Sequence, residues 1–179
     1  MKNNGHDRQP EGEISPPAYS FAVLTMSDKG SRGEREDTSG PYLVERLQRE
    51  GYVLQSHAII PDQVAVIVDA LIALADRQTV DLVVTTGGTG VAPTDVTPEA
   101  MLQVIDKEVP GMAEAMRAES LRKTPHAMLS RGKVGIRGRT LIVNLPGSLK
   151  AARENIEVVL PVLPHALEKI GGGTADCAG

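Results

Sequence analysis

The chain has 179 residues, of which 41% are hydrophobic and 23% charged, and its formal net charge is −4. This length suits one sizeable α/β domain, since domains commonly contain about 100 to 200 residues. No apolar run approaches the roughly 18 to 20 residues that span a bilayer, so we expect no membrane-spanning segment. The negative charge and the scarcity of aromatic residues, three Tyr and one Phe, argue against a nucleic-acid-binding surface.

The two ends of the chain differ in composition from the middle. Residues 1–17 are polar with three prolines, and the other end is rich in glycine. We therefore predict a flexible extension over 1–17, one folded domain over 18–171 and a flexible tail over 172–179. The single cysteine, Cys177, excludes an intramolecular disulfide and fits a reducing cytoplasm, and residues 1–17 lack the apolar segment of a secretory signal.

Short apolar runs predict the strands of a mostly parallel sheet. Residues 21–26, 82–84 and 141–143 are continuously apolar, as expected of strands that are covered on both faces. A fourth, less regular strand is predicted at 53–60. Residues 127–139 combine short apolar stretches with three glycines, which predicts a hairpin.

Helical patterns alternate with these strands. Residues 62–76 carry apolar side chains at helical spacing, and Asp62 after Pro61 is the predicted N-cap. Further helices are predicted at 41–50, ending at Gly51, at 98–106, at 111–123, and at 148–169 with an interruption near Pro161 and Pro164. The alternation predicts a three-layer α/β/α sandwich around the sheet.

Three small, polar, glycine-rich loops follow the three best strands, at residues 27–31, 85–90 and 144–148. In open parallel sheets ligands bind beyond the carboxyl ends of the strands, where these loops should meet. The middle loop, TTGGTG, suits an oxyanion because glycines let backbone N–H groups come close and hydroxyls add donors; a tight turn that requires glycine is the alternative. Neither a P-loop nor a dinucleotide-binding glycine motif is present.

Carboxylates flank the middle loop. Asp37 and Asp95 each precede a predicted helix and could be ordinary caps, but together beside a phosphate-binding loop they suggest Mg²⁺, which prefers hard oxygen ligands. Asp28 is a weaker third candidate. Ser130, Arg131 and Lys133 could bring positive charge to an anion, although a solvated basic strand explains them equally well. The four histidines, at positions 6, 57, 126 and 165, form no metal-binding pair at helical spacing.

The ordered segments SDKGSRGEREDTSGP, TTGGTGVAPTDVTPEA and NLPGSLKA, with MLSR at 128–131, resemble a known family. It is the molybdenum cofactor biosynthesis family, which includes molybdopterin adenylyltransferases and a domain of gephyrin, and the likeness covers about residues 19–171. The resemblance implies a molybdopterin-binding-like α/β/α fold, usually trimeric. Its catalytic members transfer AMP from Mg-ATP to molybdopterin.

The resemblance also assigns roles to residues. Asp37 and Asp95 become the catalytic and metal-binding carboxylates. The substrate-binding set is Ser27, Asp28, Thr86, Gly87, Gly88, Thr89, Gly90, Ser130, Arg131, Pro146, Gly147 and Ser148. The implied ligands are molybdopterin and ATP with Mg²⁺, and the implied partners are two further copies of the chain and a molybdenum-insertion protein.

Two other functions fit the same motifs. A family member can bind molybdopterin, or act as a scaffold, without adenylylating it. A nucleotide pyrophosphatase related to competence-damage proteins is the second alternative, but those typically carry Asp-Asp where this chain has Asp95 and Val96.

Overall fold

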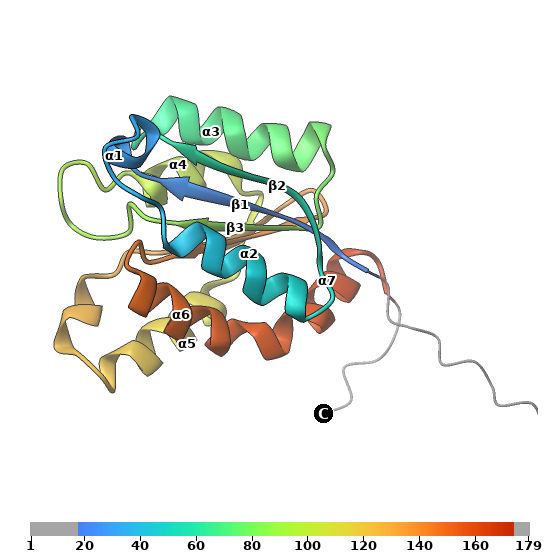
Figure 1. Cartoon of the computed structure of the whole chain (residues 1–179). Helices are drawn as coiled ribbons and strands as arrows, with labels where there is room; N and C mark the ends of the chain where they lie inside the picture. The colour runs from blue at the N-terminus through green and yellow to red at the C-terminus, as the bar shows by residue number, and fades with distance from the viewer. Residues whose placement is uncertain (1–17, 174–179) are drawn as a thin grey trace, which may run out of the picture.

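A six-stranded sheet runs through the computed structural model, which describes residues 18–173 (Figure 1). The strands are β1 (Ser20–Met26), β2 (Val53–Ile60), β3 (Leu82–Thr86), β4 (Lys107–Glu108), β5 (Val134–Arg137) and β6 (Thr140–Leu145). They lie in the order β2-β1-β3-β6-β5-β4; the first four are parallel, while β5 and β4 are antiparallel to their neighbours. The predicted extension 1–17 and residues 174–179 of the predicted tail lie outside the described residues.

Helices cover both faces of this sheet. They are α1 (Asp28–Ser31), α2 (Ser39–Arg49), α3 (Val64–Ile72), α4 (Thr97–Val104), α5 (Pro110–Leu121), α6 (Leu149–Val159) and α7 (Leu163–Ile170). Shorter turns are the π-helical η1 (Ala73–Arg77) and the 3-10 helices η2 (Pro125–Leu129) and η3 (Leu160–Val162). Helices α3 and α4 pack on one face and α2, α5, α6 and α7 on the other, which confirms the predicted three-layer sandwich (Figure 1).

Each central strand sends alternate side chains into two separate cores. Phe21 and Val23 join the core beneath α2, α5, α6 and α7, whereas Ala22 and Leu24 join the core beneath α3 and α4. All four are at most 4% exposed. Because both faces of β1 are buried, residues 21–24 of this strand form a continuous apolar run in the sequence.

Two local predictions were wrong. The hairpin is not at 127–139: residues 125–129 form η2, and β5 and β6 make the hairpin, turning at Gly138 with a positive φ of 54°. Asp62 does not cap α3, whose N-cap is Gln63. The Asp62 carboxylate instead accepts a hydrogen bond from the backbone N–H of Asp28 at 2.9 Å, which connects the loops after β1 and β2.

None of the helices within residues 18–173 has the combination of length and apolar character needed to cross a membrane.

Candidate functional site

A polar pocket of about 490 Å³ lies at the carboxyl ends of β1, β2, β3 and β6. Because the four strands are parallel, the loops that follow them meet at one edge of the sheet. The pocket is lined by Thr25, Met26, Ser27, Gly30, Arg35, Glu36, Asp37, Thr38, Ser39, Asp62, Thr86, Gly87, Gly88, Asp95, Gly147, Ser148 and Leu149. Eight of the predicted site residues are therefore together in it.

The middle loop is held open by glycines that cannot be replaced without a collision. Gly87 and Gly88 have positive φ angles of 106° and 63°, and a Cβ on Gly87 would lie 2.4 Å from the carbonyl oxygen of Met26. The N–H of Gly87 donates to the Leu145 carbonyl at 3.1 Å. Within residues 18–173 the N–H groups of Gly88, Thr89 and Gly90 have no hydrogen-bond partner. The loop thus presents three consecutive unused donors, as an oxyanion site requires.

Asp37 organises the start of α2. Its Oδ1 accepts the N–H groups of Ser39 and Gly40 at 3.1 and 2.9 Å, as a capping residue does. Its Oδ2 accepts the Thr25 hydroxyl at 2.6 Å and lies 3.2 Å from His57 Nε2. Both carboxylate oxygens are occupied by the protein, and the His57 contact was not foreseen from the sequence.

Asp95 is less constrained. Its Oδ2 accepts the Ala92 N–H at 2.9 Å, and a Cβ on Gly90 would come within 2.7 Å of the same oxygen. The carboxylate therefore folds back toward the glycine loop and lines the pocket, with Oδ1 available to a ligand.

Asp62 is the pocket carboxylate that the sequence reasoning assigned wrongly. It exchanges hydrogen bonds with Asp28: each carboxylate accepts the backbone N–H of the other residue, at 2.9 and 3.0 Å. Burial raises the pKa of Asp62, and the charges of Asp28 and Asp95 raise it further, while the N–H of Asp28 opposes the shift. Its position directly after β2 is the signal that could have identified it, by the rule applied to the other three strands.

Of the remaining predicted residues, some line a second hollow and the others line neither hollow. A neighbouring hollow of about 250 Å³ is lined by Thr89, Gly90, Ser130 and Pro146, together with residues of α5, α6 and η2. The middle loop separates it from the acidic pocket. Asp28 and Arg131 line neither hollow. Arg131 contacts the segment that carries Asp95, and Lys133 pairs with Glu108 at 2.7 Å.

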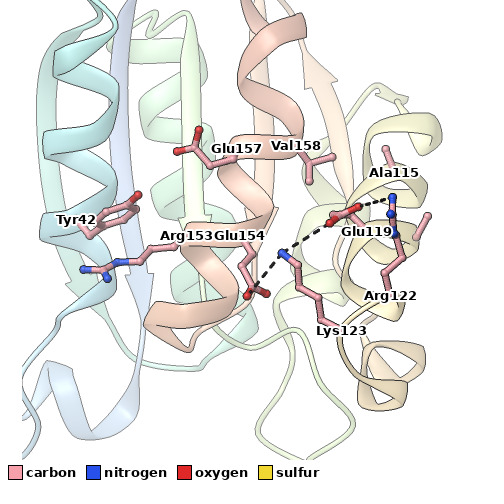
Figure 2. A pocket seen from close by; sticks show the side chains of 10 residues that line it. Tyr42, Ala115, Glu119, Arg122, Lys123, Arg153, Glu154, Glu157 and Val158 are labelled. Atoms are coloured by element: carbon pink, nitrogen blue, oxygen red, sulfur yellow. Dashed lines mark hydrogen bonds and ion pairs between the residues drawn. The ribbon is translucent and has the colours of Figure 1, made fainter.

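A larger hollow of about 710 Å³ lies away from the three glycine-rich loops, between α2, α5 and α6 (Figure 2). Its charges neutralise one another. Lys123 bridges Glu119 and Glu154, and the Arg153 guanidinium stacks over the Tyr42 ring at 4.5 Å. No predicted site residue lines it, so size alone does not identify the functional site.

Among residues 18–173 no group of three or more His, Cys, Asp or Glu side chains is arranged to hold a metal ion. Any cation in the acidic pocket must therefore take part of its coordination from a ligand or from water.

Comparison with known proteins agrees with this arrangement. A family model described as "Probable molybdopterin binding domain" matches residues 22–165. The molybdopterin adenylyltransferase of Helicobacter pylori strain J99 is 44% identical over 156 residues, covering 85% of this chain and 88% of the relative. The crystal structure of the molybdopterin biosynthesis enzyme MoaB from Thermus thermophilus has a TM-score of 0.79 at 52% identity, covering 86% of this chain and 97% of that one.

A longer relative shows the same likeness over part of its length. The molybdenum cofactor synthesis protein cinnamon of Drosophila melanogaster is 43% identical over 155 residues, which is 86% of this chain. The match covers 26% of the cinnamon protein, so the chain spans about a quarter of that relative. With a family model that covers most of the fold and relatives that match nearly end to end, the chain belongs to the molybdopterin-binding domain family of molybdenum cofactor biosynthesis.

Proposed function

We propose that this protein is a molybdopterin adenylyltransferase, which transfers AMP from Mg-ATP to the terminal phosphate of molybdopterin and releases pyrophosphate. The observation that carries the proposal is the row of three unpartnered N–H groups at Gly88, Thr89 and Gly90. It lies between an acidic pocket and a second hollow. Two ligand spaces that share one row of anion donors suit a reaction between two phosphorylated substrates.

The charge of the acidic pocket supports the assignment of this pocket to the nucleotide and its cation. The pocket lining includes four carboxylates, Glu36, Asp37, Asp62 and Asp95, against one guanidinium, Arg35. A polyphosphate alone would be repelled there, whereas a polyphosphate with Mg²⁺ would not. We place the cation at Asp95 with Asp62, because the oxygens of Asp37 are already occupied by four donors.

Asp37 then serves the site by fixing the first turn of α2. The Ser39 hydroxyl in that turn donates to the Gly147 carbonyl at 3.0 Å, which links the loop after β1 to the loop after β6. Ser27 and Ser148 cap α1 and α6 with their hydroxyl oxygens, and both line the pocket. These contacts hold the pocket wall without needing a substrate.

The proposed reaction needs no strong general base from the protein. A phosphate monoester is largely dianionic near neutrality, and one of its oxygens forms a bond to the α-phosphorus as the bond to pyrophosphate breaks. Asp95 and Asp62 would hold the Mg²⁺ ion, which would supply neutralisation of the charge on the departing pyrophosphate. The protein contributes position and N–H donors, which agrees with an acidic pocket whose lining, among residues 18–173, includes no histidine or cysteine.

Pyrophosphate release from Mg-ATP, measured anaerobically with and without molybdopterin, tests the proposal. We expect release that requires molybdopterin. In Asp95→Asn we expect turnover to fall at least about 100-fold, the order found when a charge-stabilising group is removed, with molybdopterin binding changed only a few-fold. Binding without release by the wild type would favour a scaffold or binding protein, and pyrophosphate release without molybdopterin would favour a pyrophosphatase.

We further propose a homotrimer that works in the cytoplasm and passes its product to a molybdenum-insertion protein. The support is the family membership, together with the single cysteine in the sequence. Light scattering tests the assembly, and a solution mass near the 19.0 kDa of one chain would refute the trimer.

A further inference from the structure

Arg131 uses its whole guanidinium on one segment of the chain. Its Nε donates to the Gly90 carbonyl at 2.7 Å and its Nη2 to the Asp95 carbonyl at 2.5 Å, while its Nη1 pairs with the carboxylate of Glu99. Its backbone N–H also donates to the Thr89 carbonyl at 2.8 Å. Four contacts from one residue therefore fall on residues 89–99, which lie more than 30 positions away in the sequence.

At the start of α4 this segment has a second anchor, Thr97, whose N–H donates to the Gly88 carbonyl at 3.2 Å and whose hydroxyl donates to the Gly87 carbonyl at 3.1 Å. Between Gly90 and Asp95 the chain is an exposed turn, closed by the Asp95 N–H to the Ala92 carbonyl and by the Ala92 N–H to the Asp95 carboxylate. Both of those bonds are internal to the turn. The turn continues from the glycine loop and leads into α4, and Arg131 holds both of its ends, at the Gly90 and Asp95 carbonyls.

We propose that Arg131 is a positioning residue, which holds the Asp95 turn against the glycine loop and does not itself bind substrate. The effect on catalysis that we expect from this positioning role rests on the proposed function. Arg131 lines neither hollow, although the sequence motif suggested a substrate contact. Each of its three nitrogens is engaged with the turn or with the first turn of α4, and the Arg131 contact keeps the pKa of Glu99 below its usual range.

Lysine cannot reproduce this geometry. A guanidinium is a rigid planar fork that can meet two carbonyls and a carboxylate at once, whereas an ammonium group is a point charge on a flexible stem. Arg131→Lys therefore keeps the charge and loses the bracing. Glu99→Gln removes the ion pair, which is exposed, but leaves both carbonyl contacts.

A matched control exists at the other end of the sheet. Arg137 also donates to one carbonyl, that of Val104 at 2.9 Å, and makes a forked ion pair, with Asp76. It lines neither hollow. Arg137→Lys therefore measures the cost of the same chemical change where no site residue is held.

The first experiment is a double-mutant cycle on pyrophosphate release. We expect Arg131→Lys to lower kcat at least tenfold, with molybdopterin affinity and Tm close to those of Arg137→Lys, and Glu99→Gln to lower kcat less than threefold. If Arg131 acts through Asp95, Arg131→Lys in an Asp95→Asn background costs no more than about twofold, because coupled residues are not additive. Effects that multiply would mean an independent substrate contact and would overturn the proposal.

The second experiment does not depend on activity. Hydrogen exchange of the Ala92 and Asp95 amides in the ligand-free protein should be at least about tenfold faster in Arg131→Lys than in the wild type and unchanged in Arg137→Lys, since bracing sets how often the turn opens. Unchanged exchange in Arg131→Lys would refute the positioning role. A wild type that releases no pyrophosphate would remove the proposed reaction but leave this readout intact.

Discussion

Gly40 and Gly111 occupy the same position in two helices, and we predict opposite responses to one substitution. Each is the second residue of its helix, α2 and α5 respectively. A Cβ on Gly111 would meet nothing within 4 Å. A Cβ on Gly40 would lie 2.3 Å from Asp37 Oδ2, 2.3 Å from His57 Nε2 and 2.7 Å from Thr25 Oγ1.

The magnitude follows from what must move. Crowding a packed site costs about 1 to 3 kcal/mol. The new methyl group would also displace the carboxylate that accepts the Thr25 hydroxyl at 2.6 Å, and a hydrogen bond to a charged group contributes about 1.5 to 3 kcal/mol. The higher helix propensity of alanine relative to glycine offsets about 0.5 to 1 kcal/mol of this loss. We therefore expect Gly40→Ala to lower the free energy of unfolding by about 1.5 to 5.5 kcal/mol.

Gly111→Ala should leave stability unchanged or raise it by up to about 1 kcal/mol, because the substitution restricts the unfolded chain at no steric cost. Thermal and urea denaturation of the two variants measure the contrast. For a domain of this size about 2 to 4 °C accompanies each kcal/mol, so Gly40→Ala should melt roughly 3 to 22 °C below the wild type. Equal stability of the two alanine variants would refute the account of the Asp37 cluster.

Two further predictions concern buried ionisable groups. The Tyr52 hydroxyl is buried without a partner among residues 18–173. Tyr52→Phe should therefore raise the free energy of unfolding by about 1 kcal/mol in urea titrations, and a lower value would show that the hydroxyl is satisfied. Burial raises the pKa of Tyr52 from 10.0 to about 12, so an ultraviolet titration of the wild type should show one tyrosine ionising that late, which is absent in the variant. Asp62 has a folded pKa above its ordinary 3.8, so its contribution to stability is present below pH 3.8 and lost as pH rises through the folded value. Asp62→Asn should therefore gain stability relative to the wild type between acid and neutral pH in parallel denaturation curves; a pH-independent difference would contradict the shift.

The sheet and the place of the site were predictable because both follow from rules with little local freedom. Strands buried on both faces must be continuously apolar, and the loops after parallel strands must meet. Residues 21–24 and 82–84 satisfied the first rule, and the loops that follow β1, β3 and β6 satisfied the second. The hairpin was misplaced because Gly132 and Gly138 are equally good turn signals in the sequence, and only pairing with β6 selects Gly138.

The roles of single polar residues were less predictable. A capping aspartate and a ligand-binding aspartate can have the same local sequence. Asp62 was therefore predicted to be the N-cap of α3, a position that Gln63 occupies. The resemblance assigns Arg131 to the substrate-binding set, and the motif alone does not reveal that its partners include the carbonyls of Gly90 and Asp95. Contacts between residues far apart in the chain decide such roles, and local patterns do not encode them.

The hydrogen bonds that join the loops of the pocket close long stretches of chain. Ser39 and Gly147 are 108 positions apart, and Thr86 and Pro146 are 60 apart. Forming such contacts closes long loops, which costs chain entropy and slows folding. The pocket walls need the folded chain, so a ligand that binds only the folded pocket stabilises the whole domain against unfolding, by an amount that grows with the logarithm of the ligand concentration above Kd.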